Sequence, residues 1–398
     1  MRFPRRARLR SRTLQIHRTG FRFSGRYIKV KTRRRRFAAL ASLVLAFALV
    51  AAACGDDTTD TTTAQPTPIK LQLQWVTQAQ FAGYFAAVDQ GFYADEGLDV
   101  TILQGAVDIV PQQVVASGQA EFGLAWVPKA LVSNEEGANL VDIGQVFQRS
   151  GTLEVSWADS GITAPTDWEG KKVGTWGFGN EFELTAAIEL FNVNVGEIVQ
   201  QPFDMSLLLN REIDAAEAMT YNEYAQVLEQ INPATGQLYT PADLNVIDFN
   251  DIGTAMLQDA VWVNADWLAQ PGNEDIALKF LRASFKGWIF CRDNFEECVQ
   301  IVLDNGPTLG ASHQAWQLNE INKLIWPSAN GIGVMDPLSW AQTVTVATGQ
   351  GVIQAAPPEG SYRSDLAAQA AADLEAAGLD TTGAGYAPVE VTLNPGGE

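Results

Sequence analysis

The sequence predicts an α/β protein with two similar lobes, each built on a mostly parallel sheet flanked by helices. Segments of strand character alternate with segments of helical spacing along most of the chain. This alternation occurs twice, first from Ile69 and again from Trp168. Roughly 330 residues follow Pro68, which is enough chain to build two lobes.

The first half of the chain predicts strands and helices in turn. Alternating apolar and polar residues at 70–75 and 98–103 are typical of half-buried strands, whereas 81–89 and 109–117 have helical spacing. A short strand is expected at 120–125. Because strands joined by helices run parallel, these segments predict one sheet with helices on both faces.

The second half repeats this order and then returns to the first lobe. We expect strands at 172–175, 200–203, 215–219 and 259–264. Helices are expected at 182–191 and 205–211, between the strand at 259–264 and about residue 303, and at 313–326 and 337–348. The predicted organisation is a signal peptide over 1–53, a tether over 54–68, lobe 1 over 69–165 and 259–360, lobe 2 over 166–258, and a C-terminal tail over 361–398.

The N-terminal region predicts export and lipid anchoring. Four arginines at 33–36 precede an apolar run from Phe37 to Ala53, and residues 51–54 resemble a bacterial lipobox ending at Cys54. The alternative is an uncleaved membrane anchor, because a run of seventeen residues nearly spans a bilayer. Both interpretations place the folded part at the outer surface of the cell membrane.

Charge excludes several classes of partner. Residues 1–53 hold 15 of the 27 lysines and arginines and no acidic residue, so residues 54–398 carry 12 basic against 46 acidic side chains. The resulting net charge of −34 repels nucleic acid and anionic lipid. Residues 55–68 are polar and lack side chains that could pack, which predicts a flexible tether. Contact with the membrane is therefore expected through the lipid anchor alone.

Two further cysteines, Cys291 and Cys298, form an even pair in an oxidising compartment. A turn-like break at 292–295 separates the helical runs that hold them. We therefore predict a disulfide that joins the two runs. The alternative is two buried free thiols.

Several sequence blocks carry a resemblance to a known superfamily. Residues 73–75, 83–87, 90–100, 116–123 and 169–174 resemble, in order, the substrate-binding proteins of ABC importers in the sulfonate-binding and thiamine-pyrimidine-synthase-like superfamily. The resemblance implies a type II-like, two-lobed periplasmic-binding-protein fold that closes on a ligand, acts as a monomer and delivers its ligand to a permease with its ATPase. Residues 74–81 and 326–328 are similar to carriers of vitamin-like heterocycles, either a thiamine pyrimidine precursor or riboflavin.

Aromatic and amide side chains predict a flat ligand. The sequence has 11 tryptophans, and three of them, Trp75, Trp126 and Trp176, end predicted strands, where they can stack on a heteroaromatic ring. Each could instead be a core residue. The amides of two glutamines can pair with an imide or pyrimidine edge. The candidates from this first-lobe segment are Gln78, Gln80, Phe81 and Tyr84.

A glycine-rich segment at 174–181 lies between a predicted strand and helix, so its N–H groups can converge on an acceptor atom. Its candidate ligand contacts are Gly177, Asn180 and Glu181. The carboxylate would repel an anion, and the nearest cations in sequence are Lys171, Lys172 and Arg211. Sulfonates, nitrate and phosphate esters are therefore less favoured ligands. The alternative is a turn without ligand contact.

Further candidates follow the last predicted strand of lobe 2. Tyr221 can stack, whereas Asn222 and Glu223 can pair with ring N–H or amino groups. Glu223 could equally be an acid in a first helical turn, favoured by the helix dipole. Asp259, beside the returning strand, is a weaker candidate.

The residues favour binding over catalysis. The chain has two histidines, His17 and His313, and no cysteine-rich cluster, so neither a histidine-rich metal site nor a cofactor is expected. His313 is expected to begin a helix without a chemical role. The alternatives are a thiamine-pyrimidine-synthase-like enzyme, a binder of sulfonate or nitrate-type anions, and an adhesion or scaffold lipoprotein, which would need repeats or large exposed apolar patches. We expect a receptor for a heteroaromatic vitamin or precursor, with the choice between pyrimidine and flavin left open.

Overall fold

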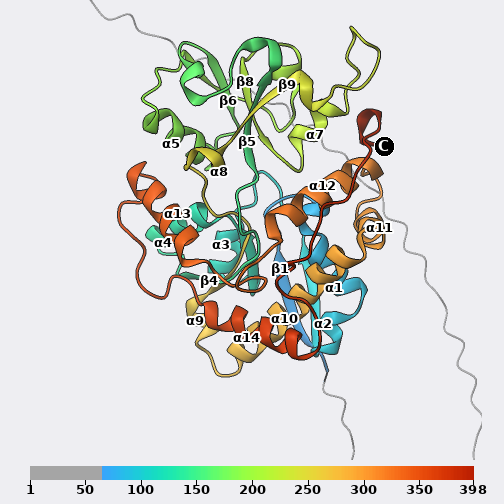
Figure 1. The fold of residues 1–398 in the computed structure, drawn as a ribbon. Helices are drawn as coiled ribbons and strands as arrows, with labels where there is room; N and C mark the ends of the chain where they lie inside the picture. Colours follow the sequence, from blue (N-terminus) through green and yellow to red (C-terminus); the bar gives the residue numbers. More distant parts are fainter. Residues whose placement is uncertain (1–64) are drawn as a thin grey trace, which may run out of the picture. The chain divides into compact units, whose positions relative to one another are not determined.

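The computed structural model describes residues 65–398, which form two five-stranded sheets flanked by helices (Figure 1). The predicted signal peptide, the predicted lipidation site Cys54 and the tether as far as residue 64 lie outside the described residues. The first strand begins at Thr67, so the last two residues of the predicted tether belong to a sheet. Within residues 65–398, no helix is both long and apolar enough to cross a bilayer.

The first sheet has the strand order β2-β1-β3-β10-β4, and we name it, with the helices packed on it, lobe 1. Its strands are β1 (Thr67–Gln72), β2 (Leu98–Leu103), β3 (Phe122–Ala125), β4 (Leu140–Gln145) and β10 (Ala260–Asn264). β1 pairs in parallel with β2 and β3, whereas β10 is antiparallel to β3 and β4. β10 follows every strand of the second sheet in the sequence, so the chain leaves the first sheet and returns to it.

The second sheet has the order β7-β6-β8-β5-β9, and we name it, with its helices, lobe 2. Its strands are β5 (Thr152–Trp157), β6 (Lys172–Thr175), β7 (Glu197–Gln200), β8 (Ala215–Met219) and β9 (Leu244–Asp248). The prediction of a strand at 200–203 was wrong, because β7 ends where the prediction begins. Pro202 lacks the N–H that a ladder needs, which explains why the strand lies before it.

Helices of both lobes surround the sheets (Figure 1). The α-helices are α1 (Ala82–Asp89), α2 (Phe92–Asp95), α3 (Pro111–Ala116), α4 (Val127–Glu135), α5 (Phe182–Leu190), α6 (Ser206–Leu209), α7 (Glu223–Leu228), α8 (Phe249–Ile252), α9 (Ala265–Leu268), α10 (Asn273–Asp293), α11 (Phe295–Asn305), α12 (Ala311–Ile325), α13 (Pro337–Gly349) and α14 (Ser364–Ala376). Short 3-10 turns occur at Ala79–Phe81, Ala158–Ser160, Pro165–Trp168, Pro241–Asp243 and Pro395–Gly397.

A disulfide joins Cys291 near the end of α10 to Cys298 in α11. Asn294 is the single residue between the two helices, and both cysteines are fully buried. The bond therefore spans the break between the two helices.

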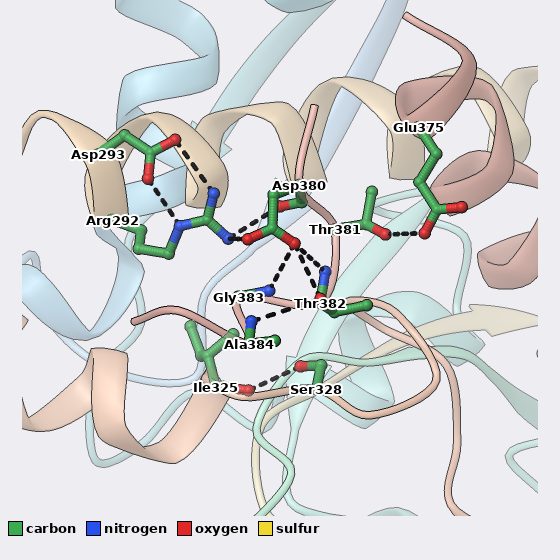
Figure 2. Close-up of polar contacts among 10 residues, drawn as sticks. All are labelled: Arg292, Asp293, Ile325, Ser328, Glu375, Asp380, Thr381, Thr382, Gly383 and Ala384. Carbon is green, nitrogen blue, oxygen red and sulfur yellow. Dashed lines mark hydrogen bonds and ion pairs between the residues drawn. The ribbon is translucent and has the colours of Figure 1, made fainter. Parts of the chain in front are cut away.

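The C-terminal segment is fixed to lobe 1 by a helix and by polar contacts. Residues 361–398 were predicted as a tail, but they contain α14, which lies beside α10. Figure 2 shows Arg292 of α10 donating a hydrogen bond of 2.8 Å to the main-chain oxygen of Asp380. The Asp380 carboxylate in turn accepts 3.0 Å bonds from the N–H groups of Thr382 and Gly383, which holds the turn after α14 in place.

Candidate ligand-binding site

A cavity of about 440 Å³ is lined by residues of both lobes, a size typical of small-molecule sites. Its wall includes residues that directly follow β1, β3, β6 and β8. Ligands of open α/β sheets bind outside the carboxyl ends of the strands, and this cavity occupies such a position in both lobes.

Most of the residues predicted to bind ligand lie at this cavity. They are Trp75, Gln78, Gln80, Trp126, Trp176, Asn180, Tyr221, Asn222 and Glu223. The others, Phe81, Tyr84, Gly177, Glu181 and Asp259, are not part of its wall. Phe81 and Tyr84 are buried in the core of lobe 1, where the Tyr84 ring lies edge-on to Trp288 at 5.7 Å between centroids. Tyr84 lies on α1, and its ring packs on Trp288 of α10, whereas Phe81 belongs to the preceding 3-10 turn.

Aromatic rings from the two lobes meet at the cavity. Trp75 follows β1 in lobe 1, and its ring centroid lies 4.9 Å from that of Phe203 in lobe 2. Trp176 follows β6, and its ring is nearly parallel to Phe203, with 11° between planes and 6.4 Å between centroids. Both Trp75 and Phe203 are half-buried and line the cavity. This cluster provides stacking surfaces for a planar ring from both sides of the cavity.

Asp259 does not reach the cavity wall but orients three residues that do. Its carboxylate accepts hydrogen bonds from Gln74 Nε2, from Gln80 Nε2 at 2.9 Å and from Trp126 Nε1 at 2.9 Å. Burial raises the pKa of Asp259 to about 6, although these hydrogen bonds oppose the rise. The carboxylate thus fixes side chains that follow β1 and β3, two neighbouring strands of lobe 1, of which β3 also lies next to β10.

The segment after β8 adds polar groups that are already paired with one another. Glu223 accepts hydrogen bonds from Met219 N at 3.0 Å and from Asn222 Nδ2 at 2.7 Å, and burial raises its pKa to about 7. Asn222 Oδ1 lies 2.9 Å from His313 Nε2, and Nδ1 of that ring lies 2.7 Å from Glu229. His313 does lie in the first turn of a helix, but it also contacts a residue of the cavity wall, which the sequence did not indicate.

The glycine-rich segment bends into the cavity through three consecutive residues with positive φ, Gly177 at 71°, Phe178 at 57° and Gly179 at 85°. Phe178 lines the cavity with 67% of its surface exposed. The Glu181 carboxylate accepts a 2.8 Å bond from Gly179 N, so it occupies an N–H group that the sequence assigned to a ligand. Glu181 therefore stabilises the turn itself.

Several residues of the wall were not found from the sequence, among them Gln112, Lys129, Phe178 and Phe203. In the sequence, the cations nearest to the glycine-rich segment are Lys171, Lys172 and Arg211. Lys129 matters most among the residues that were not found, because it adds a basic group to the cavity wall. Its Nζ donates a 2.7 Å hydrogen bond to Asn180 across the two lobes and lies 4.5 Å from the centroid of the Trp126 ring. Loss of solvation lowers the pKa of Lys129 to about 8, against the attraction of Glu217, Glu181 and Asp259. Its position in the first turn after Trp126 could have indicated it.

Metal binding has no support among residues 65–398, where no group of three or more His, Cys, Asp or Glu side chains could hold an ion. The cavity can instead stack a ring, donate hydrogen bonds from Lys129 and offer amide groups from both lobes.

Proteins of known binding function resemble this chain over most of its length. A formylaminopyrimidine-binding protein from Halalkalibacterium halodurans is 24% identical over 268 residues, which cover 66% of this chain and 78% of that protein. The riboflavin-binding protein RibY from Chloroflexus aurantiacus is 23% identical over 308 residues, which cover 73% and 84% of the two chains.

A solved structure shares the fold of this chain, and a family model matches more than half of the chain. The periplasmic sulfonate-binding protein SsuA of a sulfonate ABC transporter from Methylobacillus flagellatus superposes with a TM-score of 0.55 at 16% identity, covering 83% of this chain and 99% of its own. This likeness shows the two-lobed periplasmic-binding-protein fold that the sequence predicted. Residues 78–298, more than half of the chain, match the family described as NMT1/THI5 like. The protein therefore belongs to the NMT1/THI5-like family.

Proposed function

We propose that this protein is the extracytoplasmic substrate-binding protein of an ABC importer and that it captures a flat heteroaromatic vitamin or vitamin precursor. One observation carries the proposal: aromatic side chains of both lobes border a single cavity. Trp75 and Trp126 come from lobe 1, and Trp176 and Phe203 come from lobe 2. A ring stacked on such side chains gains on the order of 1 kcal/mol per pair beyond the buried area.

Capture between lobes supports a transport role. A ligand that touches both lobes stabilises the closed arrangement by its difference in affinity for the closed and open states. The Lys129–Asn180 hydrogen bond joins the lobes at the same cavity, so closure and binding involve the same residues. In this proposal the protein is a monomer, anchored by lipid at Cys54, and it delivers its ligand to a permease and its ATPase. The binding functions of the two relatives, one for a pyrimidine and one for a flavin, support this class of ligand.

The cavity favours binding over an enzymatic role. His313, the one histidine within residues 65–398, contacts Asn222 and Glu229 but does not line the cavity. The Glu223 carboxylate already accepts two hydrogen bonds from its own segment. The residues of the wall thus supply surfaces and hydrogen bonds for a ligand more readily than an acid and base for a reaction.

A simple anion is a weaker candidate ligand. The fold resembles that of a sulfonate-binding protein, but this cavity combines one lysine with Glu223 and a cluster of aromatic rings. A small sulfonate would leave the ring surfaces unused. Direct titration distinguishes these ligands: we expect calorimetry with the purified protein to detect riboflavin or 4-amino-2-methylpyrimidine at micromolar concentration and to detect no binding of taurine. Binding of taurine alone would reject the proposal.

Truncating an indole at the cavity should weaken binding. We expect Trp126→Ala and Trp176→Ala each to raise the Kd for the bound ring about tenfold, which corresponds to about 1.4 kcal/mol. Calorimetry measures the Kd, and circular dichroism checks that each variant is folded. The matched control is Trp340→Ala, since Trp340 packs on Tyr362 away from the cavity and should leave the Kd unchanged. Wild-type affinity in both cavity variants would contradict the site.

A further inference from the structure

Lys129 presents an ammonium group to the cavity without a carboxylate partner. An ammonium has three N–H donors, and the structure gives Nζ one hydrogen bond, to Asn180 Oδ1. Within residues 65–398, no ion pair joins Lys129 to an acidic side chain at 4.0 Å or less. The lysine is partly buried between the lobes, and its stem lies against Gly179, whose added Cβ would come within 3.3 Å of it. Its ammonium also lies 4.5 Å from the centroid of the Trp126 ring, but a charge without a counter-ion is costly to bury, so an acceptor on a ligand would be favourable here.

The nearby carboxyl groups do not pair with Lys129 in the described part of the chain. Glu217 accepts a 2.6 Å bond from Thr175 Oγ1 and a 3.0 Å bond from Trp176 N, both through Oε2, while its Oε1 is buried without a partner. Asp259 accepts three bonds from the residues it orients, and Glu181 accepts one from its own turn. These acids attract the ammonium from a distance but do not reach it. The open donors of Lys129 are therefore left for a ligand.

Two more polar atoms of the same cavity are buried without partners in the described part of the chain. Trp176 Nε1 is a donor on a side chain that is 3% exposed, and Gln112 Oε1 is an acceptor on a side chain that is 5% exposed. Both residues line the cavity, one from each lobe. A buried polar atom left without a partner costs about 1–3 kcal/mol, and each of these two atoms exposes less than 1 Å² of surface, so a ligand bonds to it only when the side chains around it shift. The donors Lys129 Nζ and Trp176 Nε1 favour acceptor atoms on the ligand, and the acceptor Gln112 Oε1 favours a donor.

We propose that Lys129, Trp176 and Gln112 recognise a ring that carries oxo groups next to a ring N–H, as in a cyclic imide. The inference rests on the proposed function and narrows its ligand class to oxo-substituted heterocycles. Carbonyl oxygens of the imide accept from the ammonium and the indole, and its N–H donates to the glutamine. An amino group in the place of an oxo group would direct N–H bonds toward the ammonium and the indole, which cannot accept them.

An alternative role for Lys129 is to join the lobes through Asn180 without contacting the ligand. Ligand selectivity distinguishes this role from recognition of an oxo group. Lumazine, a pteridine-2,4-dione, and 2,4-diaminopteridine share one ring system and differ in oxo against amino groups. We expect the wild type to bind lumazine at least tenfold more tightly. Lys129→Met keeps the stem but removes the ammonium, so it should weaken lumazine binding about tenfold and leave 2,4-diaminopteridine nearly unchanged.

The pH profile adds a readout that a purely structural role would not change. Because burial lowers the pKa of Lys129 to about 8, wild-type affinity for riboflavin should fall as the pH rises through 8. The affinity of Lys129→Met for riboflavin should not change with pH over the same range, whereas the exposed control Lys172→Met should behave as the wild type. In the comparison of the two pteridines, Lys129→Arg should restore part of the preference for lumazine.

Other outcomes overturn the inference in distinguishable ways. If Lys129→Met weakens both pteridines equally, and Asn180→Ala does the same, the lysine acts through lobe closure alone. Unchanged affinity, or a wild type that prefers 2,4-diaminopteridine, rejects the imide while leaving the proposed function in place. If the wild type binds no flat ring at all, the proposed function falls together with this inference.

Discussion

Replacing Asp259 with alanine should lower the free energy of unfolding by about 3 kcal/mol and weaken ligand binding at least tenfold. The carboxylate is 3% exposed, and it accepts hydrogen bonds from Gln74, Gln80 and Trp126. Its removal leaves buried donors without acceptors, each of which costs about 1–3 kcal/mol with incomplete additivity. The same three side chains line the cavity, so binding suffers along with stability. Urea unfolding and calorimetry measure the two effects.

Two variants control this prediction. Asp259→Asn keeps one acceptor oxygen and should lose less stability than Asp259→Ala. Asp266→Ala removes an exposed acid from the start of α9 and should change the free energy of unfolding by less than about 0.5 kcal/mol. A wild-type midpoint and wild-type affinity in Asp259→Ala would show that the carboxylate does not organise the site.

Raising the pH from about 5 to 8 should destabilise the protein, because buried carboxyl groups of lobe 2 hold their protons in the folded state. Burial raises the pKa of Glu217 to about 8 and that of Glu183 to about 7, from an ordinary value of 4.5. Burial, with the charge of Glu217 opposite it on the neighbouring strand, raises the pKa of Glu154 well above its usual range.

The direction of this pH effect on stability follows from the pH at which the folded and the unfolded states each lose the carboxyl proton. Below pH 4.5 both states keep it, so the contribution to stability is fully present there. Above that pH the unfolded chain ionises first, and stability is lost until the pH passes the folded pKa. Each such carboxyl costs about 1.4 kcal/mol per pH unit within its window. Urea unfolding at pH 5, 6, 7 and 8 measures the slope.

Glu154→Gln tests the assignment of this slope to lobe 2. The amide cannot ionise, so the variant should show a shallower decline and exceed the wild type in stability at pH 8. Glu197→Gln, on the exposed edge strand β7, is the matched control and should keep the wild-type slope. A stability that is constant or rises from pH 5 to 8 would disprove the prediction.

The sequence predicted strands with one buried face and strands that are buried on both faces. The strand at 98–103 has exposed and buried residues along its length and matches β2, and 215–219 matches β8, whose five residues are all buried. β5 went unpredicted although its residues alternate between polar and apolar, and all six of them, the polar ones included, are buried. α14 went unpredicted because its sequence is rich in alanine and has few large apolar residues to mark a helical face, and its buried side chains pack beside α10.

The site was predictable to the extent that it lies at strand ends. Trp75, Trp126 and Trp176 each follow a strand, and the carboxyl ends of parallel strands meet at one edge of a sheet. Phe203 lies in a loop of lobe 2 and meets Trp75 of lobe 1 at the cavity. The Lys129–Asn180 bond joins residues 51 positions apart on different lobes, and no local pattern encodes such a pair.

The resemblance to the superfamily was informative about fold and less so about individual contacts. Phe81 ends the block 74–81 and Tyr84 belongs to the block 83–87, yet both side chains are buried in the core of lobe 1. A Cβ at Gly83 would meet the Trp288 ring at 2.2 Å, so the block 83–87 requires a glycine where α1 packs closely on α10.

The central claim is that indoles and a phenyl ring from both lobes hold a planar ligand between them. A crystal structure of the protein with riboflavin tests it most directly. We expect the ring system in van der Waals contact with Trp75 of lobe 1 and Trp176 of lobe 2, with its imide edge toward Lys129. A ligand bound away from these indoles, or held by one lobe alone, would contradict the account.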